Sequence, residues 1–254
     1  MTDSASDWDF YFSHVDDALS SIFVDLSAIR RAPDSAKPWL LWVWVKLQSP
    51  REDGLSSGEE APKLYEIEDA LTAGPLARSG AELLGRITGN RRREFYFYSP
   101  DERSLEPAAL EVRQAFPDYD FASGAQSDPE WSQYRDLLYP SEADMQGIQN
   151  RRVLDQLEKR GDVHSIPRPV DHSIRFQNAE NRRAYAAAAV CLGFTVQDEL
   201  DDVGNGEGWP YNLVLLRTDP VVLNHLNGVT GQLLELAEQH DADYDGWGCE
   251  VQSS

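Results

Sequence analysis

The last stretch of the chain, Leu236–Val251, reads L-A-E-Q-H-D-A-D-Y-D-G-W-G-C-E-V and decides the fold of the C-terminal half. Apolar residues spaced by three and four through positions 222–236 predict a helix that ends near His240. A closing strand is predicted from Tyr244 to Val251. Asp245-Gly246 predicts a bulge or tight turn in that strand. Trp247 is expected to bury on the order of 200 Å² and to anchor the strand.

The elements before this stretch alternate between helices and strands. In order, they are a helix over Met145–Arg160, a strand over His164–Phe176, a helix from an Asn178 cap to Leu192, strands over Phe194–Leu200 and Tyr211–Arg217, and the last helix, opened by Asp219-Pro220. After the leading helix the order is β-α-β-β-α-β. This order predicts a ferredoxin-like split βαβ sandwich for the C-terminal half.

The N-terminal half has a similar predicted order after a leading β-hairpin. The hairpin is formed by Trp8–Phe12 and Ser21–Leu26, and the later elements are strands over Pro38–Leu47, Glu82–Thr88, Glu94–Tyr98 and Tyr119–Phe121, with helices at Ser57–Leu71 and Leu105–Ala115 and one opened by Asp128-Pro129. The fold class is therefore α+β, with two domains whose sandwiches are related. Pro140 and the polar Ser141–Asp144 predict domains at 1–140 and 150–254 and a linker at 141–149.

The closing stretch resembles the C-terminal signature of the regulator of ribonuclease activity B family, which carries a near-identical helix end followed by tyrosine-aspartate-glycine-tryptophan-glycine. Pro167–His172 fits the family as well. The resemblance implies a protein that binds an endoribonuclease of the ribonuclease E type and regulates it without catalysis. Family members commonly continue into a long acidic extension, whereas this sequence stops at Ser254. We therefore expect the N-terminal half to replace that surface or to direct the protein to another partner.

The N-terminal half, from about Trp8 to Pro140, resembles the domain-of-unknown-function family 695. The segments that carry this resemblance are Trp8-x-Phe10-Tyr11-Phe12, Ser20-Ser21-Ile22, Asp53-Gly54-Leu55, Ser57–Glu60, Ile67-Glu68-Asp69, Trp131-x-x-Tyr134 and Leu138-Tyr139-Pro140. That family has no established activity. The resemblance therefore implies where the N-terminal domain ends, and it implies no catalytic activity.

The chain carries a net charge of −21, and both halves are acidic. Direct binding of nucleic acid is not expected, because affinity for phosphate comes mainly from lysine and arginine. The one basic cluster, Arg91-Arg92-Arg93, is predicted to be a solvated hairpin turn. The start of the chain is polar, and the longest apolar run, Trp39–Val45, is too short to span a bilayer. We therefore expect a cytoplasmic protein without a membrane partner.

Motifs for nucleophilic catalysis, nucleotide binding and paired cysteines are absent from the sequence. Gly204–Gly208 is glycine-rich but lacks the lysine of a phosphate-binding loop, and it is predicted to be a flexible loop. The five histidines do not cluster, so no metal and no cofactor is expected. Asp171 and His172 are the fallback candidates for an enzymatic site, although neighbouring residues of a strand point to opposite faces.

Three functions remain open from the sequence. The leading hypothesis is a non-catalytic regulator that binds a ribonuclease, with a protein-binding surface at Asp241, Asp243, Tyr244, Asp245, Trp247 and Glu250. The second is an enzyme with a site between the two halves that uses His172, Asp171, Asp243 and Asp245. The third is an interaction module unrelated to ribonucleases. The sequence does not set the oligomeric state.

Overall fold

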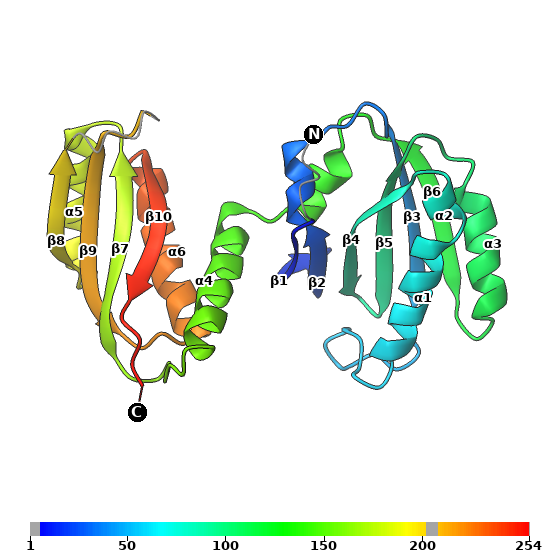
Figure 1. Cartoon of the computed structure of the whole chain (residues 1–254), viewed down its shortest axis with the longest axis horizontal. Coiled ribbons are helices and arrows are strands. Elements are labelled where there is room, and N and C mark those ends of the chain that lie inside the picture. Colours follow the sequence, from blue (N-terminus) through cyan, green and yellow to red (C-terminus); the bar gives the residue numbers. More distant parts are fainter. Residues whose placement is uncertain (1–5, 202–207, 254) are drawn as a thin grey trace. The chain divides into compact units, whose positions relative to one another are not determined.

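The computed structural model describes residues 6–201 and 208–253, and the chain divides into two compact units, Met1–Asp144 and Met145–Ser254 (Figure 1). Each unit is an α+β fold built on an antiparallel sheet. The fold class predicted from the sequence is therefore confirmed. The predicted flexible loop, Gly204–Gly208, lies outside the described residues except for Gly208.

The C-terminal unit has a four-stranded sheet in the order β10-β7-β9-β8. Its elements are α4 (Glu142–Glu158), β7 (Arg168–Phe176), α5 (Ala179–Cys191), β8 (Thr195–Asp201), β9 (Tyr211–Asp219), α6 (Leu223–Gln239) and β10 (Ala242–Cys249). Helices α5 and α6 lie on one face of the sheet and form a core with its strands (Figure 1). The order, with the last strand beside the first, is the ferredoxin-like arrangement that the sequence predicts.

Burial along β7 explains why this segment forms a strand on one side of the core. Every second residue, from Arg168 through His172 to Phe176, is buried, while Asp171 points to the opposite face and is exposed. Side chains alternate between the two faces of a strand, so one face can pack under the helices while the other stays polar.

The N-terminal unit has a six-stranded sheet in the order β1-β2-β4-β5-β3-β6. Its elements are β1 (Trp8–Val15), β2 (Ala18–Asp25), the 3₁₀ turn η1 (Leu26–Arg30), β3 (Trp39–Lys46), α1 (Ala61–Ala73), α2 (Pro75–Arg78), β4 (Glu82–Gly89), β5 (Arg92–Ser99), α3 (Leu105–Ala115), β6 (Phe121–Ser127) and the π-helical turn η2 (Gln133–Leu138). The four strands from β3 onward repeat the order of the C-terminal sheet. The predicted leading hairpin is present, and it adds β2 and β1 beside β4.

Two tight turns fix the register of this sheet. Asp16 and Asp17, which join β1 to β2, have φ angles of 51° and 61°, and Asn90 and Arg91, which join β4 to β5, have φ angles of 46° and 61°. Positive φ at both central residues matches the right-handed twist of the flanking strands. The strands of the first hairpin therefore run longer than predicted and meet at a two-residue turn.

The helices of the N-terminal unit cover only part of their sheet. Apolar residues of α1, α2 and α3 pack against the inward residues of β3 and β5, including Val43, Phe95 and Phe97. The turn η2 contacts β2 and β4, where Tyr11 donates a hydrogen bond of 3.1 Å to the carbonyl of Leu138. Phe10, Phe23 and Arg86 are in register with Phe95 and share its face, and Phe10 and Phe12 are 38% and 52% exposed. The strands β1, β2 and β4 therefore keep an uncovered stretch on the helix side.

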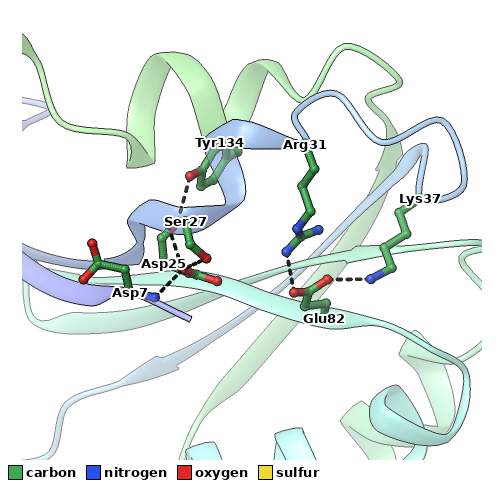
Figure 2. Close-up of polar contacts among 7 residues, drawn as sticks. All are labelled: Asp7, Asp25, Ser27, Arg31, Lys37, Glu82 and Tyr134. Carbon is green, nitrogen blue, oxygen red and sulfur yellow. Dashed lines mark hydrogen bonds and ion pairs between the residues drawn. The ribbon is translucent and has the colours of Figure 1, made fainter. Parts of the chain in front are cut away.

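A polar cluster holds the end of β2 in the N-terminal unit (Figure 2). The Asp25 carboxylate accepts hydrogen bonds from the amides of Asp7 (3.1 Å) and Ser27 (2.9 Å) and from the Ser27 hydroxyl (2.6 Å). The Tyr134 hydroxyl donates to the Asp25 carbonyl at 2.8 Å. The other groups drawn there are Glu82, Arg31 and Lys37, joined by ion pairs of 2.5 Å. These contacts tie η1 and η2 to the sheet. Asp25, Glu82, Arg31 and Lys37 each have a partner within the N-terminal unit.

Several predicted boundaries need correction. The strand expected near Tyr119–Phe121 is β6, which extends to Ser127, and the turn that follows it is π-helical rather than α-helical. Most of the predicted linker, 141–149, lies in α4. Asp219-Pro220 does not begin the last helix: α6 starts at Leu223 after Val222. The Asp219 carboxylate instead accepts a 2.7 Å bond from Arg217 and lies 2.6 Å from Nε2 of His225.

Candidate functional site

The closing strand β10 forms one edge of the C-terminal sheet and pairs with β7. Asp241 makes the turn after α6 with a φ of 47°. The register of β10 against β7 shifts between Tyr244 and Gly246, and Gly246 has a φ of 114°, which residues with a side chain rarely adopt. The bulge predicted at Asp245-Gly246 is therefore confirmed, and it turns the Asp245 side chain to solvent.

The acidic residues of the predicted surface have different environments. Asp241, Asp245 and Glu250 are exposed. Asp243 is half-buried and accepts hydrogen bonds from Nε (2.8 Å) and Nη2 (2.5 Å) of Arg175 across the strand pair. Asp245 lies 3.3 Å from the same guanidinium. One arginine therefore compensates part of the negative charge on β10, and the remainder faces solvent.

Tyr244 does not belong to this surface, because its side chain is buried in the core under α5 and α6. Its hydroxyl lies 2.8 Å from Nδ1 of His172, which is also buried. The ring of His172 packs edge-on against Phe194. Asp171 lies on the opposite face of β7 and is exposed. The two fallback catalytic candidates are therefore not brought together.

Burial, with a smaller contribution from Arg217, lowers the pKa of His172 to about 4. The imidazole is thus neutral in the folded protein near pH 7, which suits a structural role in the core. A histidine in the unfolded chain titrates near pH 6.5 and binds the proton first as the pH falls. The contribution of His172 to stability is therefore present above that value and is lost as acid approaches the folded pKa.

We expect this lost contribution to reach about 3 kcal/mol between about pH 7 and pH 4. Urea unfolding of the wild type and of His172→Gln at a series of pH values measures it. The wild type should lose stability more steeply with acid, since carboxylates contribute equally to both curves. Parallel curves would show that His172 titrates normally in the folded state.

Trp247 is half-buried and packs beside Leu154, Val170 and Leu226. Its Nε1 donates a 2.8 Å hydrogen bond to Oδ1 of Asn150, which lies on α4 and is fully buried. The side-chain amide of Asn150 makes three further hydrogen bonds. It accepts one from Gln146 (2.9 Å) and donates one each to Asn227 (2.9 Å) and Thr230 (3.0 Å). All four hydrogen-bonding positions of the Asn150 side chain are used. This network, which the sequence did not reveal, joins α4, α6 and β10.

A second buried group fixes the chain after β10. Arg168, at the start of β7, forms an ion pair with Asp162, and the side chains are 1% and 0% exposed. The guanidinium also donates to the carbonyls of Val163 (2.6 Å) and Glu250 (3.2 Å). The amide of Gln252 donates to Asp162 at 2.8 Å. Burial raises the pKa of Asp162, but the hydrogen bonds from Arg168 and Gln252 outweigh it and hold that pKa below its usual value.

The described parts of the chain, 6–201 and 208–253, hold no group of three or more histidine, cysteine, aspartate or glutamate residues placed to bind a metal ion. Over the same ranges, no helix has the length and apolar character needed to cross a membrane. The arrangement around β10 is thus an edge strand with exposed acidic side chains, held from behind by buried hydrogen bonds. Such a strand can present charge to a partner.

Solved structures with similar chains were found at low identity. An unknown protein from Galdieria sulphuraria is 9% identical, with 84% of this chain and 99% of that chain covered and a TM-score of 0.23. A putative glycine cleavage system transcriptional repressor is 7% identical, with coverage of 85% and 98% and a TM-score of 0.22. A protein from Bacteroides thetaiotaomicron is 10% identical, with coverage of 83% and 93% and a TM-score of 0.18. TM-scores this low inform neither fold nor function.

Family models match both halves of the chain, whereas no curated protein matches it. Residues 147–249 match the model described as Regulator of ribonuclease activity B. Residues 6–139 match the model described as Family of unknown function (DUF695). Both resemblances drawn from the sequence are confirmed. The chain thus belongs to the family of unknown function (DUF695), and its C-terminal part matches the regulators of ribonuclease activity B.

Proposed function

We propose that the protein is a non-catalytic, acidic regulator that binds a ribonuclease E-type endoribonuclease directly and lowers or redirects its activity. The match of residues 147–249 to the regulator family carries the proposal. The proposal includes a cytoplasmic location. It also excludes direct nucleic-acid binding, because a chain with a net charge of −21 repels phosphate.

The proposed contact surface is the acidic edge, which we define as Asp241, Asp245 and Glu250 on and around β10. All three side chains are exposed. Charges and a bulge on an edge strand hinder its pairing with another strand, so a partner is expected to meet side chains rather than extend the sheet. Asp245 shares the Arg175 guanidinium with Asp243, whereas Asp241 and Glu250 add negative charge that attracts a basic protein surface and speeds the encounter.

Neutralising the acidic edge tests this proposal. The triple variant Asp241→Asn, Asp245→Asn, Glu250→Gln should bind a purified ribonuclease E-type enzyme with an association rate lower by about three- to tenfold. Its association rate should also depend less on salt, because fewer charges contribute to the attraction. Stopped-flow or surface-based kinetics at several salt concentrations give both quantities, and the rate of RNA cleavage with and without the protein gives the direction of regulation.

A second triple variant provides the control. Glu102→Gln, Asp118→Asn, Glu130→Gln removes the same charge from exposed positions in the N-terminal unit. If both variants slow association equally, net charge rather than the acidic edge steers binding. Absence of binding by the wild type at low salt would reject the ribonuclease and favour a module with another partner. Self-association of the first variant alone would show that the acids protect the edge strand instead.

A further inference from the structure

The uncovered stretch of the N-terminal sheet contains a pocket of about 380 Å³. Phe10 and Phe12 of β1 and Phe23 of β2 line it, and Tyr65 of α1 lines it from the helix layer. Phe12 and Tyr65 are 52% and 48% exposed, which is high for aromatic residues. A pocket of this volume with aromatic walls lies in the range of small-molecule sites.

Three arginines line the same pocket, and two of them have acidic partners. Arg51 pairs with Asp53 at 2.6 Å, and Arg86 pairs with Glu68. The Arg86 guanidinium also lies 4.3 Å from the ring centre of Phe23. The positive charges of these two arginines are therefore matched within the described residues.

Arg93 is the arginine whose charge is not matched in this way. It is 4% exposed, and its hydrogen bonds among the described residues go to hydroxyl groups: Nε donates to Thr88 at 2.9 Å, and Nη2 donates to Ser56 at 3.5 Å. Its Nη1 is buried and has no hydrogen-bond partner among the described residues. Arginine is almost never fully buried unless it is paired. An unsatisfied N–H on a guanidinium that lines a pocket therefore indicates that the side chain can bind an acceptor from outside the chain.

The surroundings of Arg93 disfavour its charge. Burial, and next the positive charge of Arg86, lower the pKa of Arg93 to about 10, while the carboxylates of Glu68 and Glu60 act in the opposite direction. Thr88 and Ser56 also line the pocket, and their hydroxyl oxygens accept hydrogen bonds from Arg93. Each hydroxyl keeps its own proton, which it can donate to a ligand. The pocket thus combines hydroxyl donors with a guanidinium that forms no ion pair among the described residues, in a chain that is otherwise strongly acidic.

We propose that this pocket binds a small aromatic carboxylate, with the carboxylate on Arg93 and the ring between Phe12 and Tyr65. Arg93 is the one lining arginine without an ion pair among the described residues, and acidic side chains lie nearby, so a monoanion fits better than a phosphate monoester, which carries nearly two negative charges. A carboxylate can accept two parallel bonds from a guanidinium. Flat rings pack well against the aromatic walls. This assignment concerns the N-terminal unit and is independent of the proposed ribonuclease contact.

Three probes that share one ring system test the proposal on the full chain. They are 2-naphthoate, the neutral 2-naphthamide and 2-naphthyl phosphate, and calorimetry with ligand-observed NMR measures their binding. We expect 2-naphthoate to bind at least roughly tenfold more tightly than either of the others. Equal affinity for the acid and the amide, tighter binding of the phosphate, or no binding of the acid at about 10 mM would overturn the proposal.

Two variants place the binding in the pocket. Arg93→Gln should weaken 2-naphthoate binding by about tenfold or more while leaving the weak binding of 2-naphthamide unchanged. Phe12→Ser removes an exposed ring, so the fold is kept even if Arg93→Gln proves unstable, and it should weaken both probes. Arg103→Gln, at an exposed arginine outside the pocket, should bind as the wild type does. Unchanged 2-naphthoate affinity in Phe12→Ser, or in a folded Arg93→Gln variant, would exclude this site.

Discussion

Replacing Arg168 by methionine is expected to destabilise the C-terminal unit by about 3–5 kcal/mol, because it leaves the buried Asp162 carboxylate without its cation. Methionine fills much of the same volume, so the loss is mainly electrostatic. The carbonyls of Val163 and Glu250 lose donors as well. Calorimetric unfolding of the full chain should show a lower transition for this unit and an unchanged one for the N-terminal unit.

Arg175→Met is the matched control, because both arginines lie on β7 and pair with an aspartate. The Arg175 side chain is 30% exposed and its partner Asp243 is 34% exposed, against 1% and 0% for Arg168 and Asp162. Exposed pairs contribute only about 0–1 kcal/mol. Similar losses in the two variants would mean that the burial of Arg168 does not decide the effect.

The pH dependence of the Arg168 variant follows from the lowered pKa of Asp162. A carboxyl whose pKa is lower in the folded state stabilises the fold above its unfolded pKa, and this stabilisation is lost as the pH falls through the folded value. The wild type should therefore lose this contribution in acid. Arg168→Met no longer has the donor that chiefly lowers the pKa. The difference in stability between the two proteins should thus shrink as the pH falls, and a constant difference would contradict this account.

Much of the fold could be predicted from the sequence, because burial imposes regular spacing on neighbouring residues. Alternation through Val170, His172 and Ile174 predicts a strand with one face in the core, and the structure has it. The spacing of Leu226, Val229 and Leu233 predicts the inward face of α6, which is also observed. The predicted start of α6 was wrong, because the Asp219 carboxylate binds Arg217 and His225 and does not cap the helix.

The buried polar groups could not be predicted, because their partners are distant in the sequence. Trp247 and Asn150 are 97 residues apart, and Arg168 and Glu250 are 82 apart. No local pattern distinguishes a buried arginine from a solvated one. Arg93 was accordingly predicted to lie in a solvated turn, whereas its side chain is buried and lines a pocket. The signature residues Arg168 and Trp247 likewise hold the closing strand in place, so these parts of the family resemblance reflect the fold.

Replacing Asn150 by alanine is expected to cost about 3–4 kcal/mol, since buried groups left without a partner cost about 1–3 kcal/mol each. Gln146 and Thr230 are buried and would lose a partner, and the Trp247 indole would lose its acceptor. Asn227→Ala is the control, because it takes one acceptor from the buried Asn150 amide instead of removing all four bonds, and it should cost only about 1 kcal/mol. Equal effects of the two variants would show that the network does not act as a unit.

A double-mutant cycle between Asn150→Ala and Trp247→Phe then measures how firmly α4 holds β10. Phenylalanine keeps most of the packing of Trp247 and removes its N–H, so a coupling of about 1–2 kcal/mol is expected for this shared bond. Association kinetics of the same variants connect the network to the proposed contact. Neither substitution changes a charge, yet loosening β10 spreads the positions of Asp245 and Glu250. A slower association with an unchanged salt dependence would show that the acidic edge must be held in place as well as charged.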